Sequence, residues 1–376
     1  MTINSHTQAP AVFALYLPQY YQTSYNDEWW GEGYTEWTAC KKANPLYNGH
    51  YQPRVPQHGN YYDLSDPKNI AWQATLAREY GIDGFALYHY YSLGNRLLDV
   101  PVEALLAHDE IEVSFYLYWA NESWRKAWFG QDPKVVWKQE YGDRDDWAVH
   151  FRYCLPFFQD RRYYKIDGKP VFAIYKDNDL PDSEAFISLW NSLAKEAGLP
   201  GIFFIKTADF WNGTDKGPYD AIVTREPVYT NSCGMSKLNL LKRKVSQAIA
   251  NVGYKLNVPD KFKRVAYRGS YERAWENILN REVEDGTVLG AFCDWDNSPR
   301  RGYNSIVMDG ATPDKFGMYM ERLFQKAEKI HSPMIVVNAW NEWAEGAYLE
   351  PDERYGDGYL AAVRDARLRV CGTWGQ

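Results

Sequence analysis

Apolar runs recur along the chain, and stretches with helical periodicity lie between most of them. This alternation is expected of a parallel sheet wrapped by helices. Each run is short enough to form one buried strand. We predict eight strands, at residues 12–17, 84–88, 113–118, 171–175, 202–206, 221–224, 289–293 and 335–339.

The predicted helices fall between these runs and carry recognisable ends. Asp66-Pro67 and Ser183 lie where helices are expected to begin, and Gly81 and Gly198 where helices are expected to end. Strands and helices in this order predict a (β/α)8 barrel, in which the active site lies at the C-terminal ends of the strands. The helices are predicted at residues 69–80, 101–107, 147–158, 184–197, 314–330 and 358–370.

The segments that directly follow the predicted strands combine polar and aromatic residues. Segments at the opposite strand ends, such as Tyr80-Gly-Ile-Asp83, are plainer turn sequences. This asymmetry is typical of a barrel enzyme, so the polar and aromatic segments are candidates for the substrate site. The candidates on these segments are Tyr20, Tyr88, Tyr90, Trp119, Asn121, Glu122, Trp124, Asp294, Trp295, Trp340, Asn341 and Trp343.

Two insertions exceed the usual length of a connection. The first, residues 19–64, is expected to fold over the barrel mouth and adds Glu36 and Trp37 to the substrate-site candidates. The second, from residue 229 to about residue 285, carries a basic patch at residues 237–244, 255 and 261–264. That patch is either a solvated helical face or a site for a phosphate or anionic sugar. We predict a disordered start at residues 1–10 and a single catalytic domain over residues 11–376.

Composition narrows the possible partners. The net charge of −7 disfavours nucleic acid and an anionic membrane surface as partners. No window approaches 18 apolar residues, so no membrane insertion is expected. The 16 Trp and 30 Tyr favour a sugar ligand, because flat rings with a polar edge suit sugar faces. Five scattered cysteines without a C-x-x-C pair predict free thiols in a reducing compartment. Without a cationic start and apolar leader before the first strand, we expect a cytoplasmic protein. The scattered histidines form no metal signature, so no metal or cofactor is expected.

The last predicted strand runs into Asn341-Glu-Trp-Ala-Glu-Gly346, where Glu342 and Glu345 are candidate catalytic residues. Cleavage of a glycosidic bond needs two carboxyl groups, one to protonate the leaving oxygen and one to supply or stabilise the attacking group. Residues three apart on a helical turn have Cβ atoms roughly 5–6 Å apart, nearer the spacing of retaining than of inverting enzymes. The alternative is a pair of surface glutamates on a loop.

Four motifs in order give the chain a close resemblance to the WbsX family, which is related to glycoside hydrolase family 99. The resemblance spans about residues 12–360, nearly the whole chain. Four motifs in sequence are more specific than any one of them. They are Trp29-Trp-Gly-Glu-Gly-Tyr-Thr-Glu-Trp37, Gly49-His-Tyr-Gln-Pro53, Tyr118-Trp-Ala-Asn-Glu-Ser-Trp124 and Asn341-Glu-Trp-Ala-Glu-Gly346.

The resemblance implies a (β/α)8 barrel that acts in the metabolism of O-antigen or other bacterial surface polysaccharides. Family 99 enzymes are retaining endo-α-mannosidases, and their paired glutamates fall on Glu342 and Glu345. By this likeness, Glu342 is the base that helps the sugar 2-hydroxyl attack its own anomeric carbon, giving a 1,2-anhydro sugar. Glu345 is the acid for the leaving group and then the base for water. A suitable substrate carries α-linked mannose-type or rhamnose-type units.

Two other function classes stay open at this point. A glycosyltransferase is suggested by the D-x-D segments Asp177-Asn-Asp179 and Asp294-Trp-Asp296, because many transferases hold a metal with that pattern. Members of the WbsX family have often been labelled glycosyltransferases. An inert barrel that binds glycans and organises other polysaccharide biosynthesis enzymes is the third class. His89 is expected to pack in a hydrogen-bonded network rather than to act as a catalyst.

Overall fold

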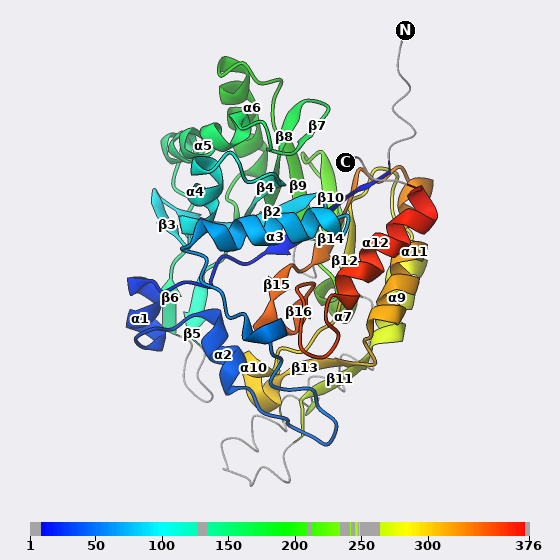
Figure 1. Ribbon diagram of the computed structural model, residues 1–376. Helices are drawn as coiled ribbons and strands as arrows, with labels where there is room; N and C mark the ends of the chain where they lie inside the picture. The colour runs from blue at the N-terminus through cyan, green and yellow to red at the C-terminus, as the bar shows by residue number, and fades with distance from the viewer. Residues whose placement is uncertain are drawn as a thin grey trace.

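Eight parallel strands form the barrel in this computed structural model, which describes residues 9–126, 134–208, 213–233, 241, 245, 246, 248 and 264–372. Each strand pairs with the next barrel strand along the chain, except β10 with β12, and β1 also pairs with β14. The predicted (β/α)8 fold and its strand positions are confirmed (Figure 1). The strands are β1 (Ala11–Tyr16), β2 (Gly84–Ser92), β4 (Ser114–Trp119), β8 (Lys169–Ile174), β9 (Phe203–Ala208), β10 (Ala221–Thr224), β12 (Leu289–Phe292) and β14 (Met334–Asn338).

The barrel is closed most weakly between β10 and β12. No ladder joins these strands in the described part of the chain, and a single parallel bridge between Val223 and Val288 links them. The amide of Val288 donates to the carbonyl of Ile222 over 3.0 Å. A Cβ atom on Gly290 would lie 1.8 Å from the carbonyl oxygen of Thr224, so the close approach of the strands requires glycine there. We refer to this joint as the β10–β12 seam.

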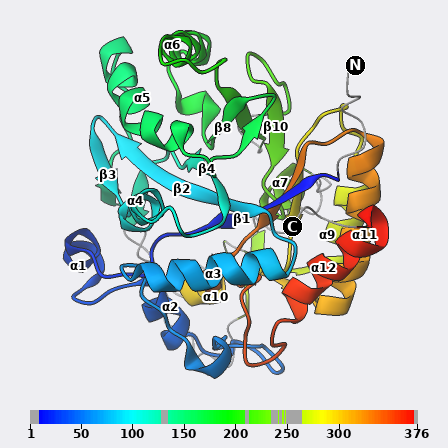
Figure 2. The same ribbon diagram turned by 45° about the horizontal axis from the view of Figure 1, so that its top comes forward.

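Helices cover the outside of the barrel, and α11 and α12 run side by side along one flank (Figures 1 and 2). All six predicted helices are present. At α3, Asp66 accepts a hydrogen bond from the amide of Lys68, and Gly81 follows the helix with a φ of 73°. The cap of α6 is Asp182 rather than Ser183. These helices are α3 (Pro67–Glu79), α4 (Val100–Ala107), α5 (Arg144–Gln159), α6 (Ser183–Glu196), α11 (Pro313–Lys329) and α12 (Gly358–Cys371).

One barrel helix lies inside the segment that we predicted as an insertion. This helix, α9 (Tyr271–Asn280), buries Tyr271, Ala274, Trp275 and Ile278, which repeat at helical spacing along one face. The ring of Trp275 stacks on Phe292 of β12 at a centroid distance of 5.5 Å. The second insertion therefore ends near residue 270 rather than near residue 285, because this buried face belongs to the barrel wall.

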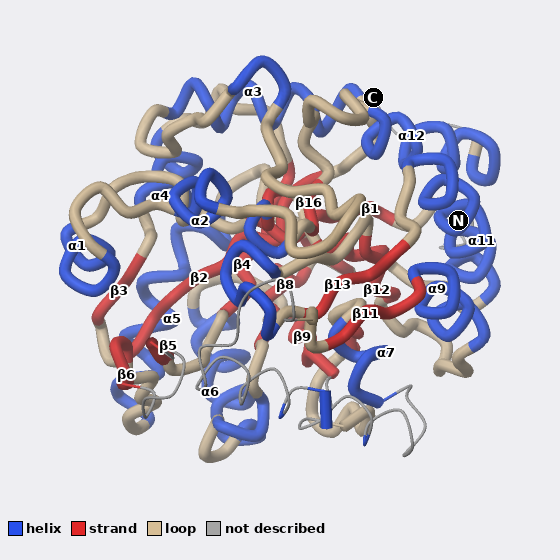
Figure 3. The backbone as a smooth tube through the Cα atoms, turned by 90° about the horizontal axis from the view of Figure 1, so that it is seen from below, coloured by secondary structure: helices blue, strands red, loops and turns tan. Residues whose placement is uncertain are grey.

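Short elements from several connections form a layer over the C-terminal strand ends, where α2 lies across the mouth (Figure 3) and α10 lies beside α2 (Figure 1). The first loop contributes α1 (Ser24–Trp30), α2 (Glu36–Lys42) and the 3-10 helix η1 (Gln57–Gly59). The hairpin after β14 consists of β15 (Asn341–Glu342), η5 (Trp343–Glu345) and β16 (Ala347–Tyr348). The remaining elements are β3 (Asn95–Leu97), β5 (Trp124–Lys126), β6 (Lys134–Trp137), β7 (Lys165–Ile166), η2 (Asp177–Asp179), α7 (Val228–Cys233), β11 (Tyr267–Ser270), α10 (Ser298–Arg301), η4 (Gly302–Asn304) and β13 (Ile306–Asp309).

Some predicted features lie outside the described residues. These are most of the basic patch, apart from residues 241 and 264, and residues 1–8 of the predicted disordered start. Over the ranges that the structure describes, no helix is both long and apolar enough to cross a membrane.

Candidate active site

The hairpin after β14 carries both candidate glutamates to the barrel mouth. Glu342 ends β15, which pairs antiparallel with β16, and Glu345 ends the short helix between them. Gly346 closes the turn with a φ of 63°, and a Cβ atom there would lie 2.9 Å from the amide nitrogen of Asp296. The side chain of Glu342 is 4% exposed and that of Glu345 is 15% exposed. The tight turn therefore places two carboxylates at the mouth, the buried one of Glu342 and the partly exposed one of Glu345.

A single arginine bridges three carboxylates at this mouth. Arg300, from α10, places Nη2 3.1 Å from Oε2 of Glu342 and Nη1 2.8 Å from Oε1 of Glu345. Its Nε also donates to Oε1 of Glu36 over 2.8 Å. Glu36 comes from α2 and is 1% exposed. Arg300 therefore joins the first loop to the hairpin and holds Glu342 and Glu345 on one guanidinium group.

A second arginine approaches Glu345 from the barrel wall. Arg225 directly follows β10, and its Nη2 lies 3.7 Å from Oε2 of Glu345. Its Nη1 donates to the hydroxyl of Tyr175 over 3.0 Å, and the guanidinium lies over the Tyr175 ring. Oε2 of Glu345 is buried and has no hydrogen-bond partner in the described structure. This buried oxygen therefore faces the charge of Arg225 without a hydrogen bond.

Burial raises the pKa of Glu342 to about 7, against the opposing effect of the positive charge of Arg300. The nearby negative charges of Glu345 and Glu36 act in the same direction as burial. Burial also raises the pKa of Glu36, again opposed by Arg300. A group that titrates near neutral pH is suited to general acid–base chemistry, because both of its protonation states are accessible.

Aromatic residues form one wall beside the carboxylates. Tyr88 and Tyr90 project from β2, and the ring of Tyr90 lies edge-on to Trp124 with centroids 5.0 Å apart. The charge of Glu342 acts on the hydroxyls of both tyrosines. The buried hydroxyl of Tyr88 has no hydrogen-bond partner in the described part of the chain. These three predicted site residues are therefore brought together near Glu342.

A second group of predicted residues packs behind the hairpin. Tyr20 donates its hydroxyl hydrogen to the carbonyl of Asn341, and Oδ1 of Asn341 accepts from the amide of Leu17 over 2.7 Å. The five residues of this group are at most 4% exposed, so they fix the hairpin in place through packing and hydrogen bonds. They are Tyr20, Trp37, Trp340, Asn341 and Trp343.

The end of β4 and the segment after it carry two buried residues that support the fold and one exposed residue. Trp119 is 2% exposed, and Asn121 is fully buried. The side chain of Asn121 accepts from the amide of Lys176 over 2.7 Å and donates to its carbonyl over 2.8 Å, which ties the ends of β4 and β8 together. Glu122 is exposed beside them. Of these three predicted residues, only Glu122 has an exposed side chain.

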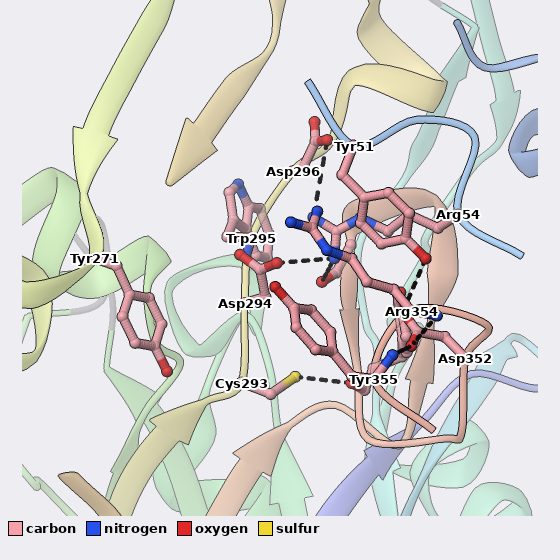
Figure 4. Close-up of polar contacts among 12 residues, drawn as sticks. Tyr51, Arg54, Tyr271, Cys293, Asp294, Trp295, Asp296, Asp352, Arg354 and Tyr355 are labelled. Atoms are coloured by element: carbon pink, nitrogen blue, oxygen red, sulfur yellow. Dashed lines mark hydrogen bonds and ion pairs between the residues drawn. The ribbon is translucent and has the colours of Figure 1, made fainter. Parts of the chain in front are cut away.

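The acidic residues after β12 have protein partners (Figure 4). Arg54 lies 2.8 Å from Asp294, and Asp296 accepts from Nε2 of Gln52 over 2.7 Å and pairs with His50 at 2.8 Å. Burial acts to raise the pKa of Asp296, but the hydrogen bond from His50 and the charge of Arg54 lower it to about 2. Trp295, between them, is 5% exposed. These contacts join the predicted loop motif Gly49-His-Tyr-Gln-Pro53 to the barrel.

Three polar residues of this site were not singled out from the sequence. The sequence could have indicated Arg225 as a site residue, since it directly follows a predicted strand. Nothing in the sequence indicates Arg300, because it lies in the connection after β12 and only the folded chain brings it to Glu342. Glu350 is 2% exposed and accepts from Trp343 over 2.6 Å, from Gln73 over 2.7 Å and from Tyr62 over 2.9 Å. It therefore supports the hairpin from behind.

One cluster of potential metal ligands lies elsewhere, between β2 and α5. His89, His150 and Cys154 are buried, and their ligand atoms lie within 4.8 Å of one another. Nε2 of His89 forms a hydrogen bond with Nε2 of His150 over 2.8 Å, so the predicted hydrogen-bonded role of His89 is confirmed. Burial lowers the pKa of His89 to about 3 and also lowers that of His150. Two neutral imidazoles that share one hydrogen bond account for their close approach.

Comparison with known proteins places the chain in a family. A family model described as "Glycosyltransferase WbsX" matches residues 12–363. The chain belongs to the WbsX family. Two curated relatives, both named "Uncharacterized protein WxcX" and from two strains of Xanthomonas campestris pv. campestris, are 30% identical over 370 residues. The match covers 97% of this chain and 50% of each relative, so the chain spans about half the length of these curated relatives.

Solved structures share the glycoside hydrolase-like fold of this WbsX chain. A protein described as "Glycoside hydrolase-like protein" matches with a TM-score of 0.59 and 13% identity, over 97% of this chain and 96% of that one. The family 99 endo-α-mannosidase of Bacteroides thetaiotaomicron, in complex with bis-tris-propane, matches with a TM-score of 0.52 and 15% identity. That match covers 98% of each chain. At these identities the likeness is one of fold.

Proposed function

We propose that this WbsX chain is a retaining, endo-acting glycoside hydrolase that cleaves α-linked mannose-type or rhamnose-type units of a bacterial surface polysaccharide. The observation that carries the proposal is the hairpin after β14, where Glu342 and Glu345 share the guanidinium of Arg300 at the barrel mouth. Two carboxyl groups held close together at the active end of a barrel are the equipment that glycosidic cleavage requires.

In the proposed first step, Glu342 takes the proton of the sugar 2-hydroxyl. The freed oxygen attacks the anomeric carbon, the bond to the leaving oxygen breaks, and Glu345 gives that oxygen its proton. The carboxylate left on Glu345 is stabilised by Arg300 at 2.8 Å and by the nearby charge of Arg225. A pKa of about 7 makes Glu342 a stronger base than an ordinary carboxylate.

In the second step, water opens the 1,2-anhydro sugar. Glu345 takes a proton from the water as its oxygen bonds to the anomeric carbon, and Glu342 returns the first proton to the 2-oxygen. Both glutamates end in their starting states, and the sugar keeps its anomeric configuration because it is inverted twice.

We assign the remaining candidates to two tasks. Tyr88, Tyr90, Trp124 and Glu122 contact the sugar, supported by the position of Tyr88, Tyr90 and Trp124 beside Glu342 and by the exposure of Glu122. The others position the catalytic groups, because their side chains are buried or already paired with protein groups. These positioning residues are Tyr20, Glu36, Trp37, Trp119, Asn121, Asp294, Trp295, Trp340, Asn341 and Trp343.

A glycosyltransferase is the second candidate, favoured by the family description. Against this candidate, a carboxylate in each D-x-D segment forms an ion pair with a protein cation. Asp177 pairs with Lys206 at 3.0 Å, and Asp294 pairs with Arg54 at 2.8 Å. A metal that bound either segment through these groups would have to break a largely buried ion pair.

The test compares two reactions of the purified protein. We expect release of reducing ends from surface polysaccharide of the source organism, lost in Glu342→Gln and Glu345→Gln and retained in the exposed control Glu282→Gln. Magnesium or manganese with a panel of sugar nucleotides tests transfer. Turnover that strictly requires a sugar nucleotide and a divalent metal would overturn the hydrolase. Glycan binding without turnover, unchanged in both variants, would indicate an inert barrel.

A further inference from the structure

A cavity of about 520 Å³ lies outside the barrel mouth, between α3 and the 3-10 helix η1. Its size falls within the range of about 300–1,000 Å³ that is usual for small-molecule sites. Neither candidate glutamate nor either mouth arginine lines it. The residues that line it include Gln57, His58, Asn60, Tyr62, Trp72 and Tyr80.

One side of this cavity is an aromatic and apolar stripe along α3. Trp72, Leu76 and Tyr80 are spaced four residues apart, so they share one helix face. Trp72 is 37% exposed, and its ring lies 6.1 Å from that of Tyr62 at 55°. An exposed indole beside a second ring offers a flat apolar face with polar edges, which suits the C–H face of a sugar ring.

The other side presents polar groups that the protein leaves open. The side chains of Gln57, His58 and Asn60 make no hydrogen bond within the described ranges, although the backbones of all three do. Two amides and an imidazole offer both donors and acceptors, which is the mixture that sugar hydroxyls need. Asp357 accepts from the hydroxyl of Tyr80, so this carboxylate already has a partner. The open side chains include no carboxylate, ammonium or guanidinium group, which favours a neutral ligand.

The floor of the cavity is the back of the catalytic hairpin. Trp343 and Glu350 line it, and Trp343 lies between the two candidate glutamates in the chain. Glu350 uses both oxygens for donors from Trp343, Gln73 and Tyr62. Because these floor groups are already satisfied, a ligand is recognised by the stripe on α3 and by the open side chains of η1 and Asn60.

We propose that this cavity is a second glycan-binding site, which holds a neutral stretch of the same polysaccharide away from the point of cleavage. The inference rests on the proposed function, since that function supplies the glycan. A polymer held at two points of one protein gains affinity through the higher effective concentration of its second contact. The site therefore acts on long chains and leaves the cleavage of short fragments unchanged.

The experiment uses Trp72→Ala and, as a second variant, Asn60→Ala, which replaces an exposed side chain that makes no hydrogen bond within the described residues. Binding is measured by calorimetry in a Glu342→Gln background, with the long polysaccharide and with short oligosaccharides cut from it. We expect a roughly tenfold loss of affinity for the long chain in each variant, in line with the usual value of one aromatic or polar anchor. We expect unchanged kcat/KM on the short oligosaccharides when Glu342 is intact. Met318→Ala, on the exposed face of α11, is the matched control.

Three outcomes decide the matter. Unchanged long-chain affinity in both variants, with normal turnover by the unmodified protein, would overturn the second site alone. Equal losses on long and short substrates would show that the cavity belongs to the cleavage site, which also overturns the inference. Neither binding nor turnover by the unmodified protein would overturn the proposed function and the second site together.

Discussion

The acidic residues after β14 share a cation, whereas those after the neighbouring strand β12 have partners of their own. Glu342 and Glu345 both contact Arg300, and Oε2 of Glu345 accepts no hydrogen bond in the described structure, although Nη2 of Arg225 lies 3.7 Å from it. Asp294 has Arg54, and Asp296 has His50 and Gln52. Both segments place two carboxylates close together in sequence beside a tryptophan. This difference supports the proposed catalytic role of the first pair, whereas the second pair joins loops to the barrel.

The largest effect is expected from the first pair. Glu342→Gln and Glu345→Gln should each lower turnover by about 10² to 10⁴, which is the usual contribution of a general acid or base. Initial rates and thermal unfolding of the same samples check this. The comparison fails if Asp294→Asn lowers turnover as much as these variants while leaving the melting temperature unchanged.

The next effect concerns the second pair. Arg54→Met should lower the free energy of unfolding by about 3–5 kcal/mol, because it leaves the buried carboxylate of Asp294 without its cation. Urea unfolding measures the change. Arg354→Met, at an exposed arginine of the adjacent loop, is the control and should change the free energy by less than about 0.5 kcal/mol. Equal values for the two variants would contradict a supporting role for Arg54.

The dependence of stability on acid pH tests the structural role of the segment after β12. The pKa of Asp296 is lowered to about 2, so its partners stabilise the fold above the ordinary aspartate pKa of about 4, and this stability is lost as the pH falls toward 2. The loss amounts to about 2 kcal/mol. Unfolding free energies from pH 6 to pH 2.5 should therefore fall more steeply for the unmodified protein than for Asp296→Asn. Parallel curves would show that Asp296 is not stabilised in this way.

The last comparison concerns the pH dependence of catalysis. The pKa of Glu342 is raised to about 7, and a base must be ionised, so kcat/KM should fall about tenfold for each pH unit below that value. Rates on a short oligosaccharide from pH 4.5 to pH 9 check this, after correction for any unfolding. A limb that instead falls as the pH rises through 7 would make Glu342 the acid and contradict its assignment as the base.

Much of this structure was predictable from local patterns. The barrel strands are apolar runs, and the segment with Glu342 and Glu345 follows the last of them. The sequence therefore predicts that both glutamates lie at the barrel mouth. Arg300 was not predictable, because α10 reaches the hairpin across a connection whose path depends on packing with α2 and η5. The helix α9 was missed because it adjoins a long insertion, although Tyr271, Ala274, Trp275 and Ile278 show helical spacing.

The residues after β12 show why carboxylates are hard to sort by sequence. Asp294 and Asp296 match a metal-binding pattern, a sugar-binding pattern and a structural one equally well. Their partners, His50, Gln52 and Arg54, come from a loop more than 200 residues earlier, as the separation of 246 between His50 and Asp296 shows. No periodicity connects such distant segments, so only the fold distinguishes these readings.

The β10–β12 seam indicates where residues can be added to this barrel. A single bridge joins Val223 to Val288, and the long second insertion enters the chain between these two residues. A chain that gains or loses residues there disturbs the joint with the fewest hydrogen bonds, while the ladders from β12 through β14 to β9 and β10 keep their register. We therefore expect a binding loop grafted between these two residues to leave Glu342 and Glu345 in place.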